Sequence, residues 1–274
     1  SRGLGDVYKR QGRGNVVQVM EANGTLQSLG HNLGQQNYDG PIVILVDKLS
    51  ASASEILAGV IQDYDRGLVI GSQTFGKGTV QRMIELSHGH LKFTEQKYYR
   101  VSGESTQNKG VEPDITIPLV FNDEEIGERS YENSLPYNHI DPIFYRSFNK
   151  VENVDLLKTI SSNRTNSNEM SIYISSQQDF YENEKNNNVV PINVEKRKSM
   201  KFAREAKILL MENKFRKSLN LDPFVTYDEF VNSDPEEISE LREGIVLKEA
   251  AEILVDSIQL KEAPSRLSFG ILNQ

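Results

Sequence analysis

The chain has 274 residues, of which 37% are hydrophobic, and its formal net charge is −8. This length is enough for one large domain or two ordinary ones, and no apolar run approaches the roughly 18 residues that a membrane-spanning helix needs. Acidic and basic residues are interspersed along an acidic chain, which argues against nucleic acid as a main partner. The chain has no cysteine, so disulfides, thiolate metal sites and a cysteine nucleophile are excluded.

The first part of the chain has the pattern of short strands around one helix. Residues 1–11, SRGLGDVYKRQ, lack apolar periodicity and read like a translated sequencing adapter, so we interpret them as a cloning scar. A β-type run follows at Val16–Met20, and Asn23-Gly24 predicts a turn. Residues 41–46, PIVILV, form a continuous apolar run that predicts a strand buried on both faces.

Small residues follow this strand and lead into a predicted amphipathic helix. The run Ser50-Ala51-Ser52-Ala53-Ser54 precedes apolar residues at helical spacing, namely Ile56, Leu57, Val60 and Ile61. Such a turn places a serine at the positive end of a helix, beside free backbone N–H groups. Ser52 is therefore a candidate nucleophile, with the N–H of Ala53 as a donor to the developing oxyanion. The alternative is that these serines only cap the helix.

Further strands are predicted after this helix, followed by a helical region. The strands are expected at residues 68–71, 79–86 and 91–101, with a loop over residues 106–115. After about residue 121 the composition shifts to Asn, Glu, Lys and Ser, and helical periodicity covers residues 198–219 and 236–260. Two polar stretches, 161–168 and 182–188, are expected to be loops. The predicted domains are a partial core at 12–120 and a helical region at 121–274.

A serine nucleophile needs a base, and Lys77 is the best candidate. It lies between Gly76 and Gly78, directly after a predicted buried strand, where a confined stem would be desolvated. Desolvation lowers the pKa of a lysine enough to let it accept a proton near neutrality. Four residues on, the side chain of Gln81 could hold the amine in place. The alternative is an ordinary solvated lysine in a glycine-rich turn.

Other chemistries fit the sequence less well. None of the four histidines, His31, His88, His90 and His139, is expected beside the serine turn, although a Ser-His-Asp triad does not require neighbours in sequence. Asp63 lies about 16 Å along the helix from Ser52, so a structural role is expected for it. The segment from Gly71 to Thr79 approaches a phosphate-binding loop, but Gly78 replaces the required Ser or Thr and a strand, not a helix, follows.

The run from Gly40 to Ile117 resembles the carboxy-terminal processing, or tail-specific, proteases. The matching pieces are GPIVILVDKLSASASEILAGVIQDY, GLVIGSQTFGKGTVQ and QKYYRVSGESTQNKGVEPDI, with 25 residues from serine to lysine. The resemblance places the nucleophile on Ser52, the general base on Lys77 and the lysine-orienting glutamine on Gln81. The rest of the chain resembles more weakly the helical carboxy-terminal region of the longer, tail-specific branch.

This resemblance implies the fold and the activity. The implied fold class is an α/β, crotonase-like core followed by a mainly helical carboxy-terminal region. The implied function is serine endopeptidase activity without metal or cofactor, on proteins with unstructured apolar carboxy-terminal tails, usually in a bacterial periplasm. An adaptor protein that delivers substrates would be a further partner. A non-catalytic scaffold on the same fold is the main alternative.

Family members carry an upstream PDZ domain, which binds tails as an added strand. A Gly-rich stretch before the Val16–Val19 strand supplies a second oxyanion donor in the family. Neither is found in this sequence, so we expect the isolated chain to be inactive or weakly active and the full-length parent to cleave tagged substrates.

Overall fold

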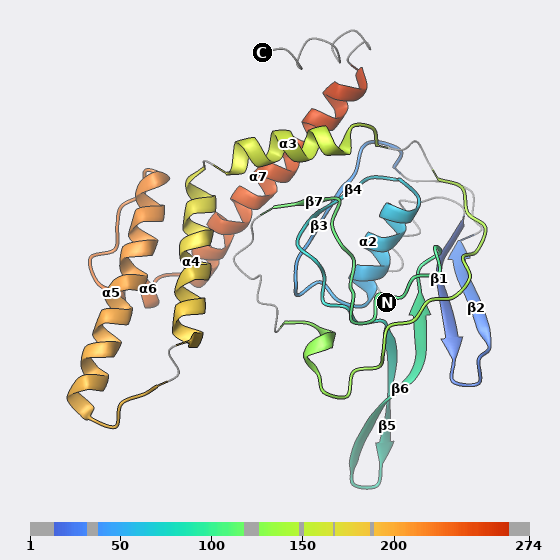
Figure 1. The fold of residues 1–274 in the computed structure, drawn as a ribbon, viewed down its shortest axis with the longest axis horizontal. Coiled ribbons are helices and arrows are strands. Elements are labelled where there is room, and N and C mark those ends of the chain that lie inside the picture. The colour runs from blue at the N-terminus through green and yellow to red at the C-terminus, as the bar shows by residue number, and fades with distance from the viewer. Residues whose placement is uncertain are drawn as a thin grey trace. The chain divides into compact units, whose positions relative to one another are not determined.

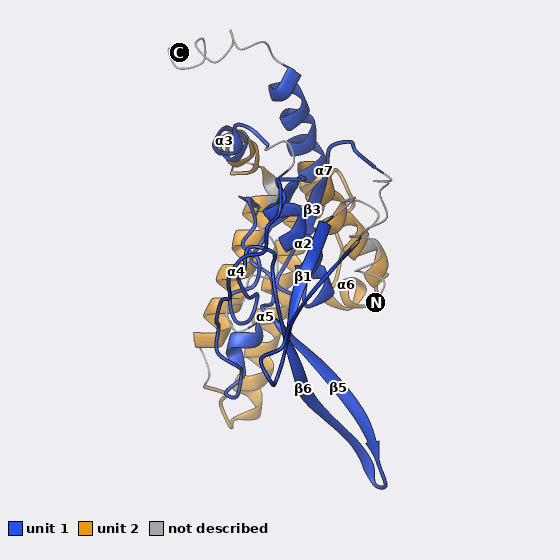
Figure 2. Ribbon diagram, turned by 90° about the vertical axis from the view of Figure 1, so that its right-hand side faces the viewer, with its two compact units in different colours: residues 1–117, 121–158, 250–274 blue, residues 118–120, 159–249 orange. Residues whose placement is uncertain are grey.

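The computed structural model describes residues 14–31, 38–117, 126–147, 151–166, 168–186 and 189–262 (Figure 1). The segment expected to be a scar, residues 1–11, lies outside them. The chain forms two compact units (Figure 2). The first unit contains residues 1–117, 121–158 and 250–274, and the second contains residues 118–120 and 159–249.

The first unit contains a four-stranded antiparallel sheet. Its strands lie in the order β2-β1-β6-β5, with bounds Leu26–His31, Gly14–Glu21, Gly89–Tyr99 and Thr79–Leu86. The predicted turn joins β1 to β2, and Gly24 has the positive φ of 84° that a glycine adopts without strain. Strands β5 and β6 form a long hairpin that extends away from the rest of this unit (Figure 2).

A second, parallel sheet contains β3 (Val43–Val46), β4 (Leu68–Gly71) and β7 (Ile115–Thr116), in the order β3-β4-β7. All four residues of β4 are buried, as predicted. The prediction that β3 is buried on both faces is wrong. This strand lies at the edge of the sheet, the side chain of Leu45 is 39% exposed, and Val43 on the same face is only partly buried.

Helix α2 (Ala53–Asp63) connects β3 to β4 and packs against both sheets. On one side, Val60 and the adjoining Tyr64 join a buried cluster with Val16, Val17, Val19, Tyr98 and Val101. On the other side, Ala58 packs with Val46, Val69 and Val111. Each fully buried valine contributes about 1.5–3 kcal/mol relative to an exposed one. The helix is therefore held firmly, and its first turn has a fixed position.

The rest of the described chain is mainly helical. Its helices are α3 (Val154–Thr165), α4 (Glu169–Asn186), α5 (Val194–Ser218), α6 (Tyr227–Val231) and α7 (Pro235–Glu262), preceded by the single-turn helix η1 (Glu128–Ser130). The helices predicted over 198–219 and 236–260 are confirmed within α5 and α7. No helix among the described residues is long and apolar enough to cross a membrane.

The loops predicted over 161–168 and 182–188 are largely wrong, because α3 continues to Thr165 and α4 to Asn186. In the part of α3 that was predicted to be a loop, the buried residues are polar. Ser161 is 1% exposed and donates to Glu249 Oε1 at 2.8 Å, and Thr165 Oγ1 donates to the Ser161 carbonyl. In α4 the final turn is exposed, so its polar side chains remain in water and the helix continues without burying them. A search for apolar periodicity misses both cases.

The second unit has its own apolar centre between α4 and α5. Tyr173, Ile174 and Phe215 are buried there, and the rings of Tyr173 and Phe215 stack with centroids 4.3 Å apart. The carboxylate of Glu212 is buried beside them and accepts hydrogen bonds from Tyr173 and Arg242. The predicted architecture, an α/β core followed by a mainly helical region, is confirmed by this arrangement.

Candidate active site

Ser52 lies immediately before α2 in an unusual backbone conformation. Its φ is 57° and its ψ is −113°. A residue that carries a Cβ is strained there, at about 1–3 kcal/mol, and such strain clusters at active sites. A sharp, strained turn from strand to helix is also what exposes the serine hydroxyl in a nucleophile elbow.

An ordinary helix cap looks different in the same chain. Asn193 and Thr226 cap α5 and α6 with extended backbones, and their side chains accept hydrogen bonds from Lys196 N and Glu229 N. This is the conformation that capping normally uses. The backbone of Ser52 departs from it, so capping alone does not account for the strain at this residue.

The carboxylate of Glu55 joins the serine turn to the lysine loop. Its Oε2 accepts the backbone N–H of Ser52 at 2.8 Å and that of Lys77 at 2.9 Å. Its Oε1 accepts Thr74 Oγ1 at 2.6 Å and the N–H of Gly76 at 2.7 Å. The side chain is fully buried, and burial raises its pKa against the opposing effect of these donors. One carboxylate therefore fixes two segments that are more than twenty residues apart in sequence.

Lys77 lies in the loop between β4 and β5 and is partly buried. Its Nζ donates to the carbonyl of Thr79 at 2.9 Å. Burial lowers the pKa of the Lys77 amine and the charge of Lys92 lowers it further, while Glu128 and Glu55 oppose the shift. A lowered pKa is what a lysine needs in order to act as a base.

The glycines on either side of Lys77 are required by a neighbouring loop. A Cβ on Gly78 would lie 2.6 Å from the backbone nitrogen of Gln107, and one on Gly76, whose φ is 93°, would lie 3.1 Å from the carbonyl carbon of Asn108. Gly78 N–H donates to Gln107 Oε1 at 2.9 Å, and Asn108 N–H donates to the Gly76 carbonyl at 2.8 Å. The loop at residues 105–110 thus packs closely on the lysine loop and forms hydrogen bonds with it.

Tyr98, on β6, reaches the same place from the sheet. Its hydroxyl contacts the carbonyl oxygens of Ser52, at 3.2 Å, and of Lys77, and it accepts a hydrogen bond from Thr106 Oγ1 at 3.0 Å. Burial and the nearby carboxylate of Glu55 raise the pKa of the Tyr98 hydroxyl, so it stays protonated. No role for Tyr98 or Glu55 was predicted from the sequence. A Glu three residues after a Ser is also the ordinary pattern of a helix start.

The structure places the other candidates as follows. Ala53 is the first residue of α2, so its N–H belongs to the unpaired group at the amino end of the helix. Gln81 lies on β5 just after a register shift, opposite Thr94, and its side chain is exposed. Among the described residues, neither the Ser52 hydroxyl nor Gln81 makes a hydrogen bond with the Lys77 amine. Catalytic hydrogen bonds are often long in the free enzyme and tighten only with substrate.

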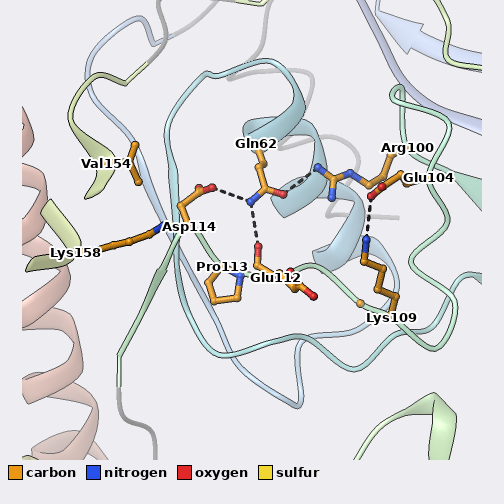
Figure 3. A pocket seen from close by; sticks show the side chains of 10 residues that line it. Gln62, Arg100, Glu104, Lys109, Glu112, Pro113, Asp114, Val154 and Lys158 are labelled. Atoms are coloured by element: carbon orange, nitrogen blue, oxygen red, sulfur yellow. Dashed lines mark hydrogen bonds and ion pairs between the residues drawn. The ribbon is translucent and has the colours of Figure 1, made fainter. Parts of the chain in front are cut away.

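The far end of α2 carries Asp63 in a structural ion pair. Its carboxylate is 2.5 Å from Arg100 Nη2 and accepts a further bond from Ser102 Oγ. Burial raises the pKa of Asp63, and Arg100 opposes the shift. A polar pocket lies beside this end of the helix, where Gln62 binds Arg100 and Asp114 (Figure 3). Asp63 thus anchors the helix at the end opposite to Ser52.

The structure also places residues that the alternative chemistries would use. His88 and His90 flank Gly89 at the tip of the β5–β6 hairpin, and His139 forms a backbone bridge with Glu104. Residues 79–86 form strand β5, whereas a phosphate-binding loop would open a helix. Among the residues that the structure describes, no group of three or more His, Asp or Glu side chains is placed to hold a metal ion.

Two family models match the chain in succession. Residues 5–117 match peptidase family S41, and residues 121–259, half of the chain, match the C-terminal domain of tail-specific protease. The chain belongs to the tail-specific proteases of peptidase family S41. The first match begins within residues 1–11, the segment interpreted from the sequence as a scar.

Similar proteins carry related names. The chain is 39% identical over 151 residues to the tail-specific protease of Haemophilus influenzae, covering 52% of this chain and 22% of that protein. It is 48% identical over 86 residues to the carboxy-terminal-processing protease of Bartonella bacilliformis, covering 31% of this chain and 20% of that one. The chain therefore spans about a fifth of the length of these relatives. Among solved structures, a photosystem II D1 C-terminal processing protease is 32% identical, with a TM-score of 0.38, over 45% of this chain and 33% of that one.

Proposed function

We propose that this tail-specific protease chain carries the nucleophile and the base of a serine endopeptidase. Ser52 attacks the peptide carbonyl and Lys77 takes its proton. The observation that carries the proposal is the strained turn at Ser52, whose backbone N–H shares one carboxylate oxygen of Glu55 with the backbone N–H of Lys77. The two residues are thereby held in one hydrogen-bond network around a buried carboxylate, with the lysine partly desolvated.

The reaction follows from these placements. The neutral Lys77 amine accepts the proton of the Ser52 hydroxyl as its oxygen bonds to the carbonyl carbon, and the N–H of Ala53 donates to the oxyanion. The Lys77 ammonium then protonates the leaving amine as the peptide C–N bond breaks, which leaves an acyl-serine. Water, deprotonated by the same amine, attacks the ester and releases the acid and Ser52. Gln81 is assigned the orientation of the lysine during these steps.

We further propose that the substrates are proteins with unstructured apolar carboxy-terminal tails. The proposed location is a bacterial periplasm, where an adaptor protein could deliver these substrates. Support comes from membership of the tail-specific proteases and from the names of the relatives above. The direct comparison uses one protein fused to an apolar or to a charged tail of equal length. Faster cleavage of the apolar fusion is expected, and equal rates would refute the assignment of the tail.

The assignment of the dyad is tested with the protein at its full natural length. A fluorophosphonate probe should label Ser52, as located by mass spectrometry of the labelled peptide. Ser52→Ala should abolish the label, and Lys77→Ala should lower the labelling rate at least a hundredfold, because general-base catalysis contributes 10²–10⁴ in rate. Absence of label from the folded, unmodified protein would favour a non-catalytic scaffold.

A further inference from the structure

The backbones of Ser52 and Lys77 are held from two sides. Glu55 Oε2 accepts the N–H groups of both residues, as described above. The carbonyl oxygens of the same two residues meet one hydroxyl, that of Tyr98. We propose that Tyr98 is a positioning residue for the serine–lysine pair, whose hydroxyl completes a clamp with Glu55 and fixes the direction in which the Lys77 side chain leaves its loop. This inference rests on the proposed function.

The direction of each hydrogen bond follows from the groups present. A phenol has one proton to donate and lone pairs to accept with. Thr106 Oγ1 already donates to the Tyr98 oxygen, so the phenol proton is available for a carbonyl. The Ser52 carbonyl already accepts from Glu55 N and Ile56 N, at 2.9 and 3.0 Å, within the first turn of α2. The Tyr98 proton is therefore directed to the carbonyl of Lys77.

Packing alone does not require this hydroxyl. The ring of Tyr98 is 2% exposed and lies among apolar side chains of the core, where a phenylalanine would fill the same space. A buried hydroxyl costs free energy unless it is bonded. Among the residues that the structure describes, this one has as hydrogen-bond partners Thr106 and the backbone carbonyls of the two proposed catalytic residues. The hydroxyl thus adds a fixed point to the lysine loop, besides those that Glu55 and the loop at residues 105–110 provide.

The adjacent Tyr99 provides a matched control. It is 0% exposed, and its hydroxyl is also bonded, since it accepts from Asn138 Nδ2 at 2.8 Å and contacts Met20 Sδ. Neighbouring residues of a strand point to opposite faces, so the hydroxyl of Tyr99 is directed away from the lysine loop. Tyr98→Phe and Tyr99→Phe each remove one buried, bonded hydroxyl, but only the first removes a contact to Ser52 and Lys77.

The experiment compares both variants with the unmodified protein at full natural length. Tyr98→Phe is expected to lower kcat and the labelling rate of Ser52 at least tenfold and to leave KM within twofold of the unmodified protein. For Tyr99→Phe, kcat, KM and the labelling rate should all stay within twofold. The acid limb of the pH profile of Tyr98→Phe should also move to higher pH, because a loosened loop admits water to Lys77 among its charged neighbours Glu55, Glu128 and Lys92.

The outcomes separate the two proposals. If the unmodified protein is labelled and active but Tyr98→Phe matches Tyr99→Phe, the clamp is refuted and the proposed function stands. If the unmodified protein is neither labelled nor active, the proposed function fails and this inference fails with it. If Tyr98→Phe does not fold, Thr106→Val replaces it, because loss of that donor frees the phenol to turn away. A loss of about threefold is expected, and an unchanged rate and pH profile would overturn the proposal.

Discussion

Replacement of Glu55 by glutamine is the sharpest test of how this site is built. The substitution keeps the shape of the side chain but turns one acceptor oxygen into an NH₂ group. That group would face either the N–H groups of Ser52 and Lys77 or the donors Thr74 Oγ1 and Gly76 N–H. Two donors lose their acceptor in either orientation. Hydrogen bonds to a charged group contribute about 1.5–3 kcal/mol each, so the expected loss is about 3–6 kcal/mol.

Urea unfolding followed by circular dichroism would measure this loss. Glu112→Gln is the matched control, because Glu112 lies in the same unit and is exposed, and its substitution should change the free energy of unfolding by no more than about 0.5 kcal/mol. The labelling rate of Ser52 should fall in Glu55→Gln even at low urea, where the protein is still folded. A loss of less than about 1 kcal/mol, with normal labelling, would show that the carboxylate does not join the two segments.

Three further predictions concern the base and its loop. Only the neutral amine of Lys77 accepts a proton, so kcat/KM should rise with pH through one ionisation. Because burial lowers the pKa of Lys77, the midpoint should lie below the ordinary lysine value of about 10.4. A midpoint at the ordinary value would contradict this prediction. Gly78→Ala should destabilise the fold by about 1–3 kcal/mol and lower the labelling rate of Ser52, because the new Cβ would lie 2.6 Å from Gln107 N. An unchanged free energy of unfolding together with an unchanged labelling rate would contradict this prediction. Joint replacement of His88 and His90 by alanine should leave kcat/KM within twofold in a peptide-cleavage assay. A large loss would instead support a histidine as the general base.

Local pattern accounts for much of the fold and for the residues of the proposed dyad. A buried strand followed by small residues and a helix predicted the position of Ser52, and glycines around a lysine after a strand predicted a desolvated amine. Both features are encoded within about ten consecutive residues. The edge position of β3 was not predictable in this way, because an apolar run does not reveal how many strands flank it.

The roles of Glu55 and Tyr98 depend on contacts that local pattern does not encode. A glutamate at the third position of a helix is explained locally by the capping pattern, yet three of its four bonds go to the loop at residues 74–77. The alternation of polar and apolar residues in β6 indicates that one face of the strand is buried. It does not indicate which groups the hydroxyl of Tyr98 contacts on that face. Polar residues concealed the end of α3 for a related reason, since Ser161 bonds to Glu249, which is distant in sequence. The end of α4 was missed for another reason, because its last turn is exposed and carries no apolar pattern.

The exposed side of β3 has a practical consequence for work on this chain in isolation. Its outer edge presents backbone donors and acceptors that no described strand pairs, and Leu45 and Leu49 are 39% and 63% exposed beside it. An open edge with uncovered apolar side chains is a template for pairing with another molecule. Preparations of the chain alone should therefore self-associate as concentration rises, and a lysine in place of Leu45 should keep them monodisperse in light scattering without altering the serine turn.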